Sequence, residues 1–186
     1  MSTLVIITGA SRGIGQATSL AFAKDARFPF LTFCLIARSK VGLSETQALV
    51  QNANPRKEIQ TSIHPIDLSD LDTLESNIKS VFQRLLDSRV YESAILINNA
   101  GSLGHVGPSA ELPSLKEMQR AVDLNVTSAL WISSYFVNCF GYEHSIKCTV
   151  VNISSLCAVT PFKTMGMYCM GKAAVSEMFD IAPIVH

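Results

Sequence analysis

The segment TGASRGIG, residues 8–15, follows directly on the apolar run LVII at residues 4–7. A buried strand that ends in closely spaced glycines and leads into a helix is the pattern of a nucleotide-binding turn. Glycines let the backbone turn tightly and approach a pyrophosphate. The helix N-terminus that follows offers unpaired N–H groups and a partial positive charge to phosphate oxygens. Alone, this pattern also fits an ordinary glycine turn, so the rest of the chain has to decide its role.

Apolar, β-branched runs alternate with helical patterns along the chain. We expect strands at residues 3–8, 31–37, 59–66, 93–98 and 147–153, and helices at residues 13–26, 41–53, 69–88, 114–141 and 166–180. This alternation is typical of βαβ units and predicts an α/β fold with helices on both faces of a parallel sheet. Right-handed crossovers then give a Rossmann-type doubly wound sheet of order 3-2-1-4-5. No linker divides the sequence, so we expect a single domain over residues 1–186.

The composition argues against several classes of partner. Fifteen basic and fifteen acidic residues balance to a formal charge of zero, which leaves no basic field for nucleic acid. Residues 124–142 carry no charge, but Asn, Ser and Thr side chains interrupt them, so we expect a buried helix and no membrane span. The five cysteines lack C-x-x-C or Cys/His spacing, which predicts reduced thiols in a cytoplasmic protein and no metal site. A small molecule is the expected partner.

Four residues form the candidate catalytic group. A carbonyl that receives hydride gains negative charge on its oxygen, so a reductase must donate a proton there. Tyr168 is the candidate acid, and Lys172, one helical turn away on the same face, supplies a cation that would stabilise the phenolate. Ser155, in the loop after the fifth strand, can hold the carbonyl oxygen. Asn125 could fix a water that links Lys172 to solvent; the alternative is a satisfied buried amide.

The end of the second strand predicts the choice of dinucleotide. An acidic residue there would accept ribose hydroxyls and repel a 2′-phosphate. This chain has Arg38 instead, and Arg12 in the first loop can reach the same phosphate, so both favour NADP(H), unless both are solvated surface side chains. Asp67, after the third strand, is placed to receive the adenine amino group or to cap the next helix. The expected cofactor-binding residues are Gly9, Ala10, Ser11, Arg12, Gly13, Ile14, Gly15, Arg38, Ser39, Asp67, Leu68, Asn99, Ala100, Gly101, Tyr168 and Lys172.

These motifs together resemble the classical short-chain dehydrogenase/reductase family. The glycine motif, the NNAG segment at residues 98–101 and the tetrad Asn125, Ser155, Tyr168 and Lys172 carry the resemblance. Residues 97–104, 151–158 and 161–163 are similar to the family members that reduce side-chain ketones of pterins. The resemblance implies NADPH-dependent pterin reduction in tetrahydrobiopterin biosynthesis by a cytosolic homodimer. It also implies that Ser154, Ser155 and Tyr168 meet the substrate carbonyl. For Leu103, Cys157, Phe162 and Met167, a pterin wall and plain core packing both stay open.

The family pattern implies further strands and substrate-covering helices after Lys172, whereas only residues 173–186 follow it here. We therefore expect a domain that lacks the family's last strands, with the fifth strand as an apolar edge and Pro183 stopping the last helix. An alternative splice product, a mispredicted gene end and a truncation all fit this pattern. Two alternative functions follow. One is a weakly active or inactive product that binds NADP(H) or pairs with the full-length enzyme through helices 114–141 and 166–180, and the other is a reductase of another small ketone.

Overall fold

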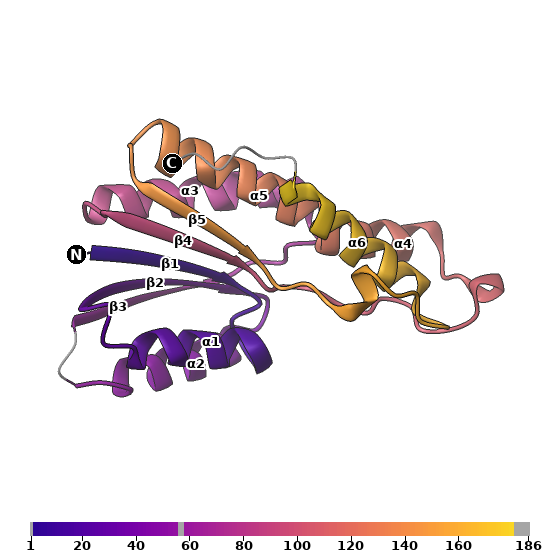
Figure 1. Ribbon diagram of the computed structural model, residues 1–186, viewed down its shortest axis with the longest axis horizontal. Helices are drawn as coiled ribbons and strands as arrows, with labels where there is room; N and C mark the ends of the chain where they lie inside the picture. The colour runs from indigo at the N-terminus through magenta and orange to yellow at the C-terminus, as the bar shows by residue number, and fades with distance from the viewer. Residues whose placement is uncertain (1, 56–57, 181–186) are drawn as a thin grey trace.

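The computed structural model describes residues 2–55 and 58–180. Within these ranges, five parallel strands form one twisted sheet (Figure 1). The strands are β1 (Ser2–Thr8), β2 (Phe30–Ala37), β3 (Glu58–Pro65), β4 (Ser93–Asn98) and β5 (Lys147–Asn152). Their order is β3-β2-β1-β4-β5, which confirms the predicted Rossmann-type topology. All carboxyl ends of a parallel sheet of this kind meet at one edge, where ligands bind.

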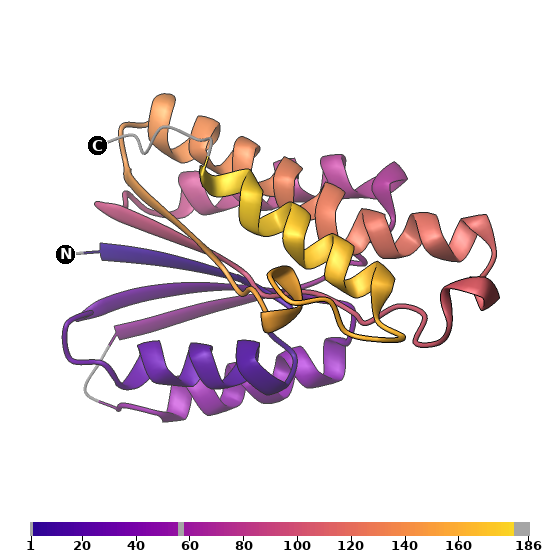
Figure 2. The ribbon, with the colours of Figure 1, turned by 45° about the vertical axis from the view of Figure 1, so that its right-hand side comes forward.

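Helices cover both faces of the sheet. They are α1 (Gly13–Lys24), α2 (Lys40–Asn52), α3 (Leu71–Ser88), α4 (Leu115–Val122), α5 (Ser128–Phe136) and α6 (Gly166–Asp180), with 3-10 turns η1 (Ser109–Glu111) and η4 (Leu156–Ala158). Figure 1 shows α1 and α2 on one face and α3 and α5 on the other. Figure 2 shows α6 lying on the same face as α4 and α5, with which it is in contact.

Two separate apolar cores follow from the strand geometry. Successive side chains of a strand point to opposite faces of the sheet. In β1, Leu4 and Ile6 pack into the core beneath α3 and α5, and Val5 and Ile7 pack into the core beneath α1 and α2. All four are fully buried. A strand that is buried on both faces has an unbroken run of apolar residues in the sequence. For this reason the run at residues 4–7 predicted the position of β1.

The long helix expected at residues 114–141 is interrupted by two π-helical turns. A capping box between Ser114 and Glu117 starts α4. The turn η2 (Asp123–Thr127) separates α4 from α5, and the turn η3 (Val137–Tyr142) follows α5. Single π-helical turns are rare and often lie at functional sites. Here η2 carries the buried Asn125.

Three further features concern the ends of elements. The helix α3 begins at Leu71 with Asp70 at its N-cap, so the alternative prediction that Asp67 caps it is wrong. The strand β5 pairs with β4 and forms an edge of the described sheet, where Val151 is 38% exposed. The predicted helix stop at Pro183 lies outside the described residues. Over the ranges that the structure describes, no helix has both the length and the apolarity needed to cross a bilayer.

Candidate active site

A cleft of about 790 Å³ lies at the carboxyl ends of the strands. This volume is in the range of small-molecule and cofactor sites. Four loops that follow different strands, together with the start of α2 and the turn η2, form its walls. The lining residues are Gly9, Ser11, Arg12, Gly13, Ile14, Ala37, Arg38, Ser39, Val41, Gly42, Glu45, Ile66, Leu68, Asn99, Ala100, Gly101 and Leu124. Most of the residues expected to bind a cofactor therefore meet in one cleft.

The glycine turn after β1 is shaped to receive an anion. Gly9 and Gly13 have positive φ angles of 66° and 56°, which side chains rarely adopt. A Cβ atom on Gly15 would collide with the backbone of Gly9 and lie 2.7 Å from Nδ2 of Asn99, so α1 packs directly on the turn. A Cβ atom on Gly13 would meet nothing within 4 Å. This open space lies before the first N–H groups of α1.

The N-terminus of α1 is available to a phosphate. Its N-cap residue, Arg12, has extended backbone, and no side chain of the described residues makes a capping hydrogen bond there. The first turn of α1 contains no acidic residue. The first N–H groups of a helix have no partner within it and carry a partial positive charge. The turn, the open space and the helix end together fit the pyrophosphate of a dinucleotide.

The helix α2 forms a wall that the sequence did not reveal. A Cβ atom on Gly42 would lie 2.7 Å from the carbonyl oxygen of Ser11, so α2 packs against the glycine turn. This brings Val41 and the carboxylate-bearing Glu45 to the cleft. The Ser39 hydroxyl caps α2 by accepting a hydrogen bond from the Gly42 N–H at 3.1 Å. Gly42, just inside the helix expected at residues 41–53, was a signal in the sequence that could have indicated this close packing.

Lys172 and Tyr168 lie together at the start of α6. Lys172 is only 8% exposed, and its ammonium group donates a hydrogen bond of 2.6 Å to the carbonyl oxygen of Ile153. Its Nζ atom is 5.7 Å from the centre of the Tyr168 ring. The Tyr168 side chain is half-buried, and its hydroxyl forms no hydrogen bond with any other residue that the structure describes. The phenol hydroxyl is therefore available to a ligand beside a fixed cation.

Burial lowers the pKa of Lys172 below its ordinary value because the charged form loses its hydration. The folded protein thus holds this proton less tightly than the unfolded chain. The contribution of Lys172 to the free energy of unfolding should therefore increase with pH. The increase begins near the lowered pKa of the folded protein and ends at about 10.4, the ordinary pKa of lysine. We expect wild-type protein to gain stability relative to Lys172→Met over this window. Urea unfolding of both proteins at several pH values measures the difference. If the free energy of unfolding had the same pH dependence in both proteins, the burial effect would be contradicted.

Ser155 and Ser154 differ in their hydrogen bonds. The Ser155 hydroxyl oxygen accepts a hydrogen bond of 3.2 Å from the Cys157 N–H at the start of η4, which leaves its own hydrogen free to donate. The Ser154 hydroxyl is 2.7 Å from the hydroxyl of Ser176 on α6. Ser155 is therefore fixed by its own loop, whereas Ser154 is tied to the helix that carries Lys172.

Asn125 holds the loop after β4 in place. Its Oδ1 atom accepts a hydrogen bond of 2.9 Å from the Ser102 N–H, and its Nδ2 atom donates one of 3.0 Å to the Ser102 carbonyl oxygen. A Cβ atom on Gly101 would lie 3.1 Å from this Oδ1 atom and 3.8 Å from Nζ of Lys172. Gly101 therefore lies where Asn125 and Lys172 come closest to the cleft. The Asn125 side chain is a satisfied amide, and the relay water stays a prediction.

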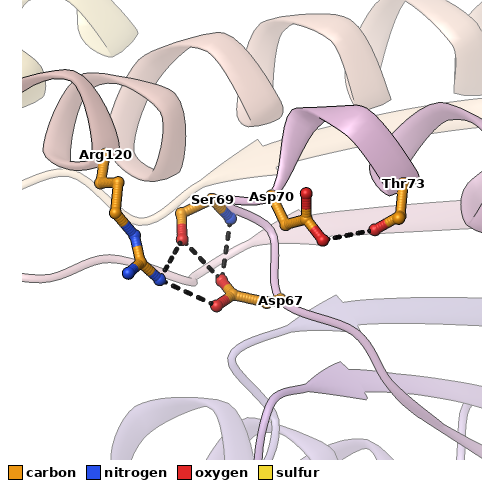
Figure 3. Close-up of polar contacts among 5 residues, drawn as sticks. All are labelled: Asp67, Ser69, Asp70, Thr73 and Arg120. Carbon is orange, nitrogen blue, oxygen red and sulfur yellow. Dashed lines mark hydrogen bonds and ion pairs between the residues drawn. The ribbon is translucent and has the colours of Figure 1, made fainter. Parts of the chain in front are cut away.

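Five predicted cofactor residues do not line the cleft, namely Ala10, Gly15, Asp67, Tyr168 and Lys172. Ala10 is fully buried, its N–H donating to the Ile36 carbonyl oxygen at 3.2 Å and its own carbonyl accepting from the Thr46 hydroxyl at 2.9 Å. Gly15 is buried against Gly9. Asp67 lies between two lining residues but is itself bound by Ser69 and Arg120 (Figure 3). Ala10 and Gly15 shape the turn, and a ligand would reach it through neighbouring residues.

The candidate substrate walls fall into two pairs. Leu103 and Phe162 are 43% and 40% exposed, whereas Cys157 and Met167 are each 9% exposed. The exposed pair presents apolar surface that a bound ring could cover, and the other pair belongs to the packed interior. Within the described ranges, no three His, Cys, Asp or Glu side chains gather as metal ligands would.

Comparison with known proteins agrees with this geometry. The family described as short chain dehydrogenase matches residues 3–182. Sepiapterin reductase of Rattus norvegicus is 33% identical over 180 residues, covering 96% of this chain and 67% of that protein. Benzil reductase ((S)-benzoin forming) of Bacillus subtilis is 34% identical, covering 95% of this chain and 64% of that protein. The chain thus spans about two thirds of the length of these curated relatives.

A solved structure shares the fold. The NAD+-bound xylitol dehydrogenase superposes with a TM-score of 0.77 at 22% identity, covering 95% of this chain and 62% of that one. At this identity the likeness concerns the arrangement of strands and helices alone. The match of the family over almost the whole chain, the strand order and the nucleotide-binding turn agree with one another. The chain belongs to the short-chain dehydrogenase/reductase family of oxidoreductases.

Proposed function

We propose that this protein reduces a side-chain ketone of a pterin with NADPH, as the name of the rat relative suggests. The observation that carries the proposal is the pair of Tyr168 and Lys172. A free phenol hydroxyl lies beside a buried ammonium group near a cleft that fits a dinucleotide. A second candidate substrate is an aromatic diketone, favoured by the identity with benzil reductase.

The side chains divide the proton chemistry among them. When bound in the cleft, the reduced nicotinamide supplies the hydride. Tyr168 donates its hydroxyl proton to the carbonyl oxygen as negative charge develops there, so the ketone becomes a secondary alcohol. The ammonium group of Lys172 stabilises the phenolate left behind. Ser155 donates its free hydroxyl hydrogen to the same carbonyl oxygen and orients the substrate.

Substrate and cofactor tests separate the candidates. Purified protein is titrated with NADPH by fluorescence and then supplied with sepiapterin or benzil while NADPH oxidation is followed. Faster oxidation of NADPH with sepiapterin than with benzil supports pterin reduction, and the reverse order supports the diketone. Binding of NADPH without turnover of either substrate would contradict the proposed reductase and favour a product that only binds nucleotide.

Arg38 and Arg12 support the choice of NADP(H). Both side chains are exposed, both line the cleft, and Arg38 immediately follows β2. A guanidinium group can form two hydrogen bonds with a 2′-phosphate. We expect Arg38→Ala to raise the Kd of NADPH at least about tenfold, the size of a hydrogen bond between charged groups, without changing that of NADH. Equilibrium fluorescence titration measures both constants.

A matched variant controls for the loss of charge. Lys24 lies in the last turn of α1, at the end of the helix away from the cleft. Lys24→Ala should leave both dissociation constants unchanged. An equal loss of NADPH and NADH affinity in Arg38→Ala would contradict the assignment of Arg38 to the phosphate.

The proposal also includes a homodimer in the cytoplasm. Sedimentation of the purified protein would test the oligomeric state, and cell fractionation would test the location.

A further inference from the structure

Asp67, Ser69 and Arg120 form a polar cluster beside the cleft, named here the Asp67–Arg120 clasp (Figure 3). Oδ1 of Asp67 accepts hydrogen bonds from the Ser69 N–H at 3.0 Å and from the Ser69 hydroxyl at 2.7 Å. Nη2 of Arg120 lies 3.3 Å from Oδ2 of Asp67 and 3.4 Å from the Ser69 hydroxyl oxygen. Two residues from distant parts of the sequence, Ser69 and Arg120, thus hold the carboxylate of Asp67.

The clasp joins two walls of the cleft. Asp67 follows β3 and stands between Ile66 and Leu68, which both line the cleft. Arg120 lies on α4, in the same continuous helical segment as Leu124, which lines the cleft from the other side. The Arg120 side chain is 57% exposed, so it extends over the surface to reach Asp67. This contact therefore links the β3–α3 loop to α4 across the surface.

The Asp67 carboxylate is not the N-cap of the helix α3. Its N-cap residue is Asp70, whose Oδ2 atom accepts a hydrogen bond of 2.8 Å from the Thr73 hydroxyl (Figure 3). A role in starting the helix therefore does not explain why the Asp67 carboxylate is held by both Ser69 and Arg120. The Asp67 carboxylate instead joins its own loop, through Ser69, to Arg120 on α4.

The charges around Asp67 keep it ionised. Partial burial alone would raise the pKa of Asp67, but the hydrogen bonds from Ser69 and the charges of Arg38 and Arg120 outweigh it and hold the pKa below its ordinary value. An ionised carboxylate has about four acceptor positions. Ser69 occupies two and Arg120 one, so one position on Oδ2 stays open to a donor from a ligand.

We propose that Arg120 is a positioning residue that turns the open acceptor position of Asp67 towards the amino group of a bound adenine. The inference rests on the proposed function, since it requires a nucleotide in the cleft. Without Arg120, Ser69 alone holds the carboxylate through Oδ1, so Oδ2 can tilt away from the adenine, and the β3–α3 loop loses this contact with α4. The recognition of adenine then weakens while the phosphates and the nicotinamide keep their partners.

The test compares two cofactors that differ only in the base. Reduced nicotinamide hypoxanthine dinucleotide phosphate has a 6-oxo group where NADPH has the 6-amino group. We expect Arg120→Met to raise the Kd of NADPH about fivefold, the size of one hydrogen bond, and to leave that of the hypoxanthine cofactor unchanged. Fluorescence titration of the purified protein gives both constants. The preference for adenine over hypoxanthine should therefore fall by the same factor.

Two variants make the comparison specific. Arg120→Lys keeps a cation within reach of Asp67 and should keep most of the preference for adenine. Lys116→Met removes an exposed cation from the same helix and should not change either constant. Thermal unfolding confirms that each variant is folded. An unchanged base preference in Arg120→Met would overturn the inference alone, whereas failure of the wild type to bind NADPH would overturn the proposed function and the inference with it.

Discussion

Tyr168→Phe should lower the rate of substrate-dependent NADPH oxidation by a factor of about 10² to 10⁴, the usual contribution of a positioned general acid. The change removes one hydroxyl and keeps the ring beside Lys172. That hydroxyl forms no hydrogen bond with another described residue, so its loss should cost the fold little. The Kd of NADPH should change by no more than about fivefold, the size of one hydrogen bond. Single-turnover kinetics with saturating NADPH measures the loss in the chemical step.

Tyr142→Phe is the matched control for this change. Tyr142 is 62% exposed and lies at the end of η3, away from the cleft. The same loss of a phenol hydroxyl there should leave turnover unchanged. Undiminished turnover in Tyr168→Phe would remove Tyr168 as the proton donor. An equal loss in both variants would point to a general effect on the protein and not to proton transfer.

Gly15→Val should strongly destabilise the fold. Even a single Cβ atom at this position would overlap the backbone of Gly9 and lie close to the Asn99 side chain. Backbone cannot give way as a flexible side chain can, so α1 would have to move off the sheet. We expect a loss of more than about 3 kcal/mol, the upper part of the range for overpacked cores, against a typical total of about 5–15 kcal/mol. Urea denaturation followed by circular dichroism measures the loss.

Gly13→Ala separates packing from ligand approach in the same turn. A methyl group on Gly13 meets no protein atom within 4 Å, but the residue has a positive φ angle of 56°. Strain of this kind costs an L-residue roughly 1–2 kcal/mol. The variant should therefore fold and lose NADPH affinity, because its methyl group occupies the open space before α1. If Gly15→Val were as stable as Gly13→Ala, the close packing of α1 on the turn would be refuted.

The sheet and its order could be predicted because the central strands β1, β2 and β4 are largely buried and apolar, and helical patterns separate all five strands. The run at residues 4–7 is buried on both faces, and the small polar residues after it mark the carboxyl end of β1. The same reasoning predicted which loops surround the cleft, since carboxyl ends of parallel strands meet at one edge. In the strands and the loops that follow them, the local sequence pattern and the overall strand order point to the same fold.

Contacts between distant segments could not be predicted in this way. Asp67 and Arg120 are 53 residues apart, and neither lies in a motif that points to the other. Glu45 reaches the cleft only because α2 packs against the glycine turn. The π-helical turn around Asn125 was also missed, because residues 124–142 carry no charge and mix apolar with small polar side chains, so a shift of one residue leaves no clear mark in the helical pattern. Each of these features depends on packing in three dimensions.

The extra residue in η2 also bears on how relatives should be aligned with this chain. An α-helix advances by about 100° per residue, so removing one residue from a π-helical turn would rotate everything after it by about that angle. Ile132 and Phe136, now fully buried against the sheet, would turn out of the core, and Leu130, now 49% exposed, would turn with them. A one-residue gap placed within residues 123–127 would therefore pair side chains from different faces of the helix. Alignments that keep this turn intact preserve the correspondence of both the core and Asn125.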